Sequence, residues 1–180
     1  MLDNQLLIQG LGFFGLLFQL FSFQANDRSK ILFRQGIGAI FFAVHFFLIG
    51  AFSGATISAV IAARNAVFYE KTKESWANHK IWMFFFMILL VALTLFFAWE
   101  GWFSLLPLCG TVVGTYARWN DKSNLIREFS LGGVTLWLIY SIIVGSIPAI
   151  INNALLLASV FVGFLRFDKH VDFHKLMHHG

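Results

Sequence analysis

The sequence predicts an all-α membrane protein with seven transmembrane helices, and three observations lead to this prediction. Of the 180 residues, 58% are hydrophobic and only 12% are charged, whereas soluble domains carry about 25% charged residues. Apolar stretches long enough to cross a bilayer recur along the whole chain. All thirteen Lys and Arg residues would then fall on one side of the membrane. Because a spanning segment must satisfy its backbone groups internally, each stretch is predicted to be a helix.

The spans are predicted, in chain order, at Gln5–Phe23, Ile31–Ile49, Phe52–Tyr69, Ile81–Ala98, Trp102–Arg118, Leu125–Val144 and Ile147–Arg166. Each is close to the roughly 20 mostly apolar residues that a crossing needs. The segment before the first span, Met1-Leu2-Asp3-Asn4, lacks the basic residues of a signal peptide. We therefore expect the first apolar stretch to be a transmembrane span that is not cleaved. Short turns around Gly50, Gly101 and Gly145 make the neighbouring helices antiparallel hairpins.

Charge sets the expected orientation. The basic residues form four clusters, namely Arg28, Lys30 and Arg34; Arg64, Lys71, Lys73 and Lys80; Arg118, Lys122 and Arg127; and Arg166, Lys169 and Lys175. Cytoplasmic loops are enriched in Lys and Arg, so we expect the N-terminus to lie outside and the C-terminus in the cytoplasm. The net charge of +4 is confined to these short loops, which favours anionic lipid headgroups over nucleic acid as the partner.

The two ends of the chain resemble each other, which predicts an internal repeat. Residues 26–31 correspond to residues 120–125, Gly38 to Gly132 at the same spacing, and Gly50 to Gly145 after one inserted residue. The single fourth span between the two units makes them parallel. We therefore expect a 3+1+3 arrangement: a three-helix bundle at 1–70, an inner loop and linker helix at 71–100, a second bundle at 101–167, and a cytoplasmic His-rich tail at 168–180.

This arrangement, with the inner loops Phe23-Gln24-Ala25-Asn26-Asp27-Arg28-Ser29 and Ala117-Arg118-Trp119-Asn120-Asp121-Lys122-Ser123, resembles the SWEET, semi-SWEET and PQ-loop superfamily. More narrowly, the whole chain resembles the YgjV-type bacterial inner-membrane proteins. The superfamily includes nicotinamide riboside transporters and KDEL receptors, so the resemblance implies either transport or a non-transporting receptor. The chain departs from sugar-transporting relatives, which use a set of helix prolines as hinges, because it has only Pro107 and Pro148.

Polar side chains deep in a span are costly unless paired, so they are the candidate substrate-binding residues. At equivalent points of the two repeats, hydrogen-bonding groups are predicted to lie at one depth above two aromatic faces. The candidates are His45, Ser58, Tyr140, Asn152 and Asn153, with Phe42 and Trp137 one helical turn beneath. Such a layer suits a small polar ligand held between two repeats. The alternative is that these groups only hold helices together.

Arg64 and Asn65 lie in the inner half of the third span, where they are candidates for an anion contact or an inner gate. Arg64 is also close enough to the span end for its side chain to reach the headgroups. No Asp or Glu occurs deep in a predicted span, and proton-driven transporters usually depend on such carboxylates. We therefore expect downhill movement of a small sugar-like or vitamin-like metabolite by alternating access; the alternative is a membrane receptor or scaffold.

Two motifs are weaker than they look. Gly10-Leu11-Gly12-Phe13-Phe14-Gly15 spells a dinucleotide fingerprint, but within an apolar span it favours close helix packing, and no cofactor is expected. In the tail, His170, His174 and His178 would share one helix face and are weak candidates for a metal site. No catalytic triad, metalloprotease helix or carboxylate pair occurs, so enzymatic activity is not expected. The sequence leaves the oligomeric state open.

Overall fold

The computed structural model describes residues 2–23, 28–71, 73–119 and 123–167, and within these ranges all regular secondary structure is helical. The seven α-helices are α1 (Leu2–Phe23), α2 (Arg28–Leu48), α3 (Phe52–Glu70), α4 (Ile81–Phe97), α5 (Leu105–Trp119), α6 (Ser123–Ile143) and α7 (Ile147–Phe167). Short 3-10 helices precede α4 (η1, Ser75–Asn78) and α5 (η2, Trp102–Ser104). The predicted all-α class is confirmed for these residues, and each predicted apolar stretch corresponds to one α-helix.

Two of the turns between helices are built in the same way. Gly50 and Gly145 have positive φ angles of 78° and 70°, which glycine adopts without a steric penalty. At the end of α2, Ala51 N donates to Phe46 O at 2.8 Å, and at the end of α6, Ser146 N donates to Ser141 O at 3.0 Å. This is the Schellman motif, in which glycine reverses the chain and the last helical carbonyls are satisfied. The two motifs lie 95 residues apart in the chain. We call the end of the molecule that carries these turns the outer end.

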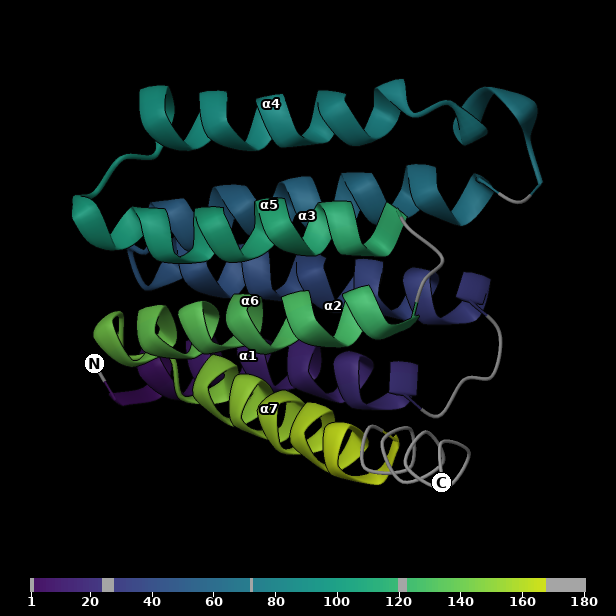
Figure 1. Cartoon of the computed structure of the whole chain (residues 1–180). Coiled ribbons are helices and arrows are strands. Elements are labelled where there is room, and N and C mark those ends of the chain that lie inside the picture. Colours follow the sequence, from purple (N-terminus) through teal and green to yellow (C-terminus); the bar gives the residue numbers. More distant parts are fainter. Residues whose placement is uncertain (1, 24–27, 72, 120–122, 168–180) are drawn as a thin grey trace.

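The helices form two layers of three (Figure 1). One layer contains α1, α2 and α3, and the other contains α5, α6 and α7. Helix α3 contacts α5 at one edge and α1 contacts α7 at the other, so that six helices close into a ring. The remaining helix, α4, lies outside the ring and covers the edge at which α3 meets α5.

Glycine pairs hold the first two helices of each layer close together. A Cβ on Gly15 of α1 would lie 3.1 Å from Gly38 O of α2, and a Cβ on Gly110 of α5 would lie 2.7 Å from Gly133 O of α6. Backbones approach this closely only where side chains are absent. Gly132, the neighbour of Gly133, takes no part in such a contact, because a Cβ on Gly132 would meet nothing within 4 Å.

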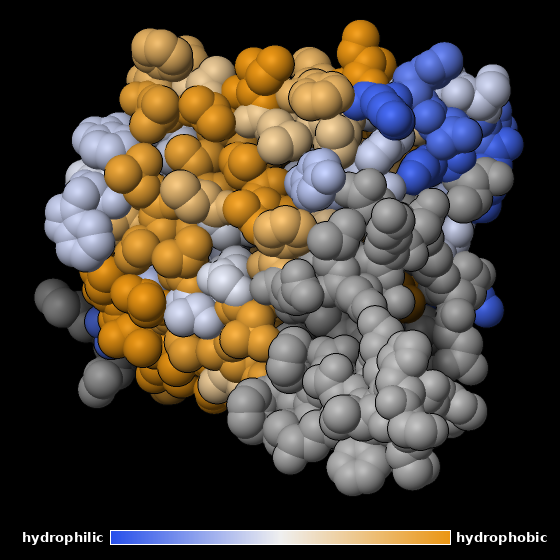
Figure 2. Space-filling model, in the orientation of Figure 1, coloured by the Kyte–Doolittle hydropathy of each residue, from blue (hydrophilic) through white to orange (hydrophobic). Residues whose placement is uncertain are grey.

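Large apolar side chains cover the outside of the molecule, with exposed fractions as high as 81% for Phe96 and 83% for Phe97. Figure 2 shows this apolar surface along the helices and the most hydrophilic residues at the end opposite the outer turns. Within the described residues, the segments Gln5–Ser22 and Ser29–Leu48 are by themselves long and apolar enough to cross a membrane. Apolar helical segments at 81–97, 131–143 and 147–159 are shorter.

Candidate functional site

A cavity of about 130 Å³ lies between the two helix layers. Six helices contribute to its lining, three from each layer. The lining residues are Gln19, Gln35, Ala39, Phe42, Phe46, Ser58, Ile61, Arg64, Asn65, Gly110, Thr111, Gly114, Arg118, Phe129, Gly133, Val134, Trp137, Ala149, Asn152, Asn153 and Leu156. A cavity of roughly 150 Å³ holds a molecule the size of benzene. The space between the layers therefore suits a small ligand.

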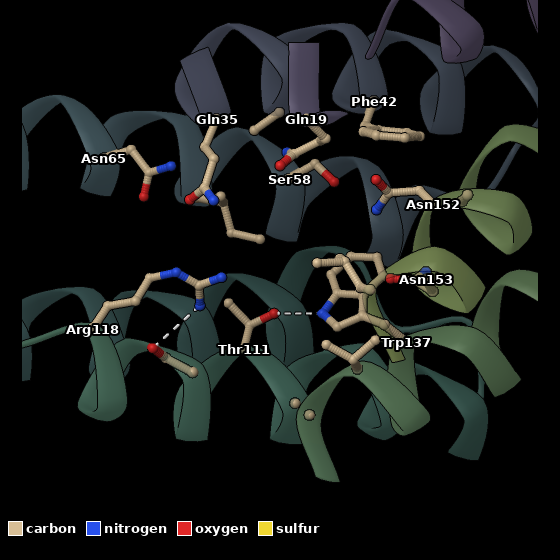
Figure 3. Close-up of a pocket in the computed structure, with 18 of the residues that line it drawn as sticks. Gln19, Gln35, Phe42, Ser58, Asn65, Thr111, Arg118, Trp137, Asn152 and Asn153 are labelled. Atoms are coloured by element: carbon tan, nitrogen blue, oxygen red, sulfur yellow. Dashed lines mark hydrogen bonds between the residues drawn. The ribbon is translucent and has the colours of Figure 1, made fainter. Parts of the chain in front are cut away.

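Seven of the nine membrane residues singled out from the sequence line this cavity, and Figure 3 shows several of them facing it. They are Phe42, Ser58, Arg64, Asn65, Trp137, Asn152 and Asn153. They come from α2, α3, α6 and α7, which are distant in the chain but meet across the two layers. The structure thus brings together most of the predicted binding residues.

Hydrogen bonds position the aromatic and amide groups of the wall. Trp137 Nε1 donates to Thr111 Oγ1 of α5 at 2.9 Å. Asn153 Nδ2 donates to Ser141 Oγ at 3.1 Å, and Ser141 Oγ in turn donates to Trp137 O. Because these bonds link three helices, the indole ring and the amide are held in fixed positions beside the cavity.

Tyr140 was predicted to face the ligand but is not among the lining residues. Its hydroxyl accepts a hydrogen bond from Gly54 N at 2.8 Å and lies 2.9 Å from Ser53 Oγ. The single O–H of Ser53 donates to the Glu100 carboxylate at 2.6 Å, so the Tyr140 O–H donates to Ser53. Tyr140 is fully buried. The hydrogen bonds of its hydroxyl group are all made with the other layer. This contact lies nearer the outer end than Trp137 does.

His45 likewise lies outside the cavity lining. Its Nδ1 is 2.8 Å from Ile8 O and its Nε2 is 2.8 Å from Ser146 Oγ. A carbonyl can only accept, so Nδ1 carries the proton, and in the neutral ring Nε2 accepts from the serine. His45, Ser53, Glu100, Tyr140 and Ser146 make up what we call the outer network. It joins α1, α2 and α3 to α6 and to the turn before α7.

The other end of the cavity is basic. Arg64 is only 1% exposed. Its Nη1 donates a hydrogen bond to Thr115 Oγ1 at 2.7 Å. Its Nε and Nη2 donate to Asn65 Oδ1 at 3.3 and 3.0 Å. The guanidinium therefore points across to α5, not toward the span end. From α5, Arg118 also lines the cavity, with Nη1 3.3 Å from Gly114 O.

Sequence reasoning missed Thr111, Arg118, Gln19 and Gln35 as lining residues. Arg118 stood at the end of a predicted span and was grouped with the cytoplasmic charges. A signal was present, because Thr111, Gly114 and Arg118 follow the spacing of one helix face. The candidate metal ligands His170, His174 and His178 lie outside the described residues. Among the residues that the structure describes, no group of three or more potential metal ligands occurs.

The lining groups are amides, hydroxyls, guanidiniums and aromatic rings, which bind a ligand through hydrogen bonds, charge and stacking. A helical ring that encloses polar side chains and carries large apolar side chains on its outside is the organisation of a helical membrane protein. The chain belongs to the bacterial inner membrane protein family Imp-YgjV, whose family model matches residues 6–171. Comparison with curated proteins and with solved structures gave no match.

Proposed function

We propose that this protein is an inner-membrane transporter or facilitator that moves a small polar metabolite, sugar-like or vitamin-like, through the cavity between its two helix layers. The observation that carries the proposal is the cavity itself, to which both layers contribute polar and aromatic side chains. A site shared by two bundles can be exposed to either side when the bundles move against each other.

In this proposal all seven helices cross the membrane, with the outer end outside and the basic end in the cytoplasm. The hydrophilic surface at one end of the molecule supports this orientation. The two layers are parallel three-helix repeats joined by α4. The matching Schellman turns at Gly50 and Gly145, and the matching pairs Gly15–Gly38 and Gly110–Gly133, support the repeat at a constant spacing of 95 residues. Helix order and the inner loops support, in the same way, a distant relationship with the SWEET and PQ-loop superfamily.

The outer network supports a state in which the outer end is closed. Opening that end would separate Tyr140 from Ser53 and Gly54, and His45 from Ser146. Interhelical hydrogen bonds in membranes average about 0.6 kcal/mol each. A few such bonds can therefore hold one state while leaving the other within thermal reach.

Movement in this proposal is downhill. Among the described residues that line the cavity none is Asp or Glu, and intramembrane carboxylates are the usual carriers of coupling protons. A second candidate function is that of a membrane receptor or scaffold. The one observation that favours it is the outer network, because the polar groups of this network form hydrogen bonds with each other and need no ligand.

Uptake into proteoliposomes, screened over sugars, nucleosides and vitamins, tests the proposal. For any solute taken up, Trp137→Ala and Asn153→Ala should lower the rate without lowering expression. Trp102→Ala and Asn78→Ala are matched controls at exposed positions outside the cavity. Unchanged rates in both cavity variants would remove the site, and a failure of every solute to enter would favour the receptor or scaffold.

A further inference from the structure

We propose that the basic end of the cavity is an anion subsite, in which Arg64, Arg118 and the amide Nδ2 of Asn65 hold the carboxylate or phosphate group of a small ligand whose uncharged part lies against Trp137. This inference rests on the proposed function and deepens it by naming the chemical class of the substrate. The proposal is carried by three features of these side chains.

The first feature is a buried positive charge whose hydrogen bonds all go to neutral groups. Arg64 is 99% buried, since only 1% of its surface is exposed, and it donates to the Asn65 amide oxygen and the Thr115 hydroxyl. Among the described residues no carboxylate pairs with it. Taking a charge out of water is costly unless an opposite charge compensates it. These three bonds use three of the five N–H donors of a guanidinium, which leaves two for a ligand.

The second feature is an unsatisfied amide donor. Asn65 is also only 1% exposed, and its Nδ2 has no hydrogen-bond partner among the described residues. The orientation of the amide is fixed because Oδ1 accepts from Arg64. Buried polar groups without partners are rare in folded proteins. An acceptor atom on a ligand in the cavity that Asn65 lines would satisfy this N–H group.

The third feature is a second guanidinium on the opposite layer. Figure 3 shows Arg118 extending from α5 along the cavity, with Gln35 and Asn65 on the facing helices. Two guanidinium groups therefore line this end of the cavity, and none of the described lining residues is Asp or Glu. Planar guanidiniums match the geometry of carboxylate and phosphate, which they often bind through two parallel hydrogen bonds.

The opposite end of the cavity has a different character. Phe42 and Trp137 offer flat aromatic faces there, and Asn153 adds an amide. With a volume of about 130 Å³, the cavity takes a ligand of about the size of a benzene ring. A small planar molecule with one anionic group satisfies both ends at once.

Binding of a matched set of ring compounds to the purified full-length protein tests the inference. Benzoate and phenyl phosphate carry the anionic group, and benzamide is the neutral counterpart of benzoate. Isothermal titration in low-salt HEPES buffer should give a dissociation constant at least about tenfold lower for one or both anions than for benzamide. The better of the two anions distinguishes carboxylate from phosphate ligands. Equal affinity for benzoate, phenyl phosphate and benzamide, or no binding of either anion, would overturn the subsite.

The variants Arg64→Gln and Asn65→Leu should abolish the preference for the anion. Thermal unfolding separates this role from a purely structural one. Taking an uncompensated charge out of water opposes folding, whereas the hydrogen bonds of Arg64 to Asn65 and Thr115 favour it. Because Arg64→Gln removes both effects, it should unfold at about the same temperature as the wild type. If Arg64→Gln unfolds earlier and still prefers the anion, Arg64 only holds α3 against α5. Lys73→Gln, at an exposed position outside the cavity, is the control.

The two proposals fail in different ways. Uptake of neutral solutes without anion preference would leave transport standing and overturn the subsite. Selective anion binding without uptake of any anion would support the subsite and overturn transport.

Discussion

The hydroxyl group of Tyr140 lies 2.9 Å from Ser53 Oγ, and this contact joins the two helix layers at the outer end of the protein. The same hydroxyl accepts from Gly54 N, and Ser53 passes the chain of hydrogen bonds on to Glu100. Tyr140 therefore holds the two layers together just beyond the cavity wall that Trp137 forms.

Tyr140→Phe should weaken the closed outer end. The change leaves Gly54 N without its acceptor, and an unsatisfied buried donor costs about 1–3 kcal/mol. Ala149 lines the cavity on the outer side, so we expect a cysteine there to react about tenfold faster with an impermeant maleimide added outside. The measurement uses a Cys109→Ser background. Tyr69→Phe, at the opposite end of α3, is the control, and equal labelling rates in the two variants would argue against a gate at Tyr140.

Thr111→Val should weaken ligand binding through Trp137. Valine has the shape of threonine but cannot accept the hydrogen bond from Trp137 Nε1. We expect an affinity loss of roughly 1 kcal/mol, or about fivefold, because the indole ring is no longer fixed. Thr111→Ser keeps the acceptor and should bind almost as well as the wild type. If the valine and serine variants bind alike, the hydrogen bond has no part in recognition.

Neighbouring glycines of α6 should respond in opposite ways to alanine. A Cβ on Gly133 would lie 2.9 Å from Gly110 O, so Gly133→Ala should destabilise the fold by about 1–3 kcal/mol. Gly132 has open space around it, and Gly132→Ala should stabilise the helix by about 0.5–1 kcal/mol. Thermal unfolding in detergent measures both. A common shift in both variants would contradict the close packing of α5 against α6.

The orientation can be tested with single cysteines. Lys73→Cys and Lys122→Cys should react with an impermeant reagent only from the cytoplasmic side, because basic loops remain there. Trp102→Cys, in the short helix η2, should react only from outside. Labelling of positions 73 and 122 from opposite sides would rule out the parallel arrangement of the two bundles.

The fold was largely predictable because its determinants are local. Apolar length predicted where helices occur, and Gly50 and Gly145 marked where α2 and α6 end. The cavity was predictable in part, since Trp137, Asn153 and Arg64 are conspicuous within apolar stretches. The sequence did not predict that His45 and Tyr140 lie outside the cavity lining. Their hydrogen-bond partners are on other helices or turns, namely Ile8 O, Ser146, Ser53 and Gly54. Thr111 and Arg118 were not recognised as lining residues from the sequence, because only the packing of α5 against the other helices places them beside the cavity.

The most direct test of the account is to block the cavity in a working protein. In a Cys109→Ser background, Ser58→Cys would place a thiol on the cavity wall. Proteoliposome uptake of the solute identified by screening is then measured before and after reaction with a bulky maleimide. The wild type labelled at the exposed Cys109 is the control. We predict that labelling at position 58 stops uptake and that labelling at Cys109 does not. Undiminished uptake after complete labelling at position 58 would show that the solute does not pass between the two layers.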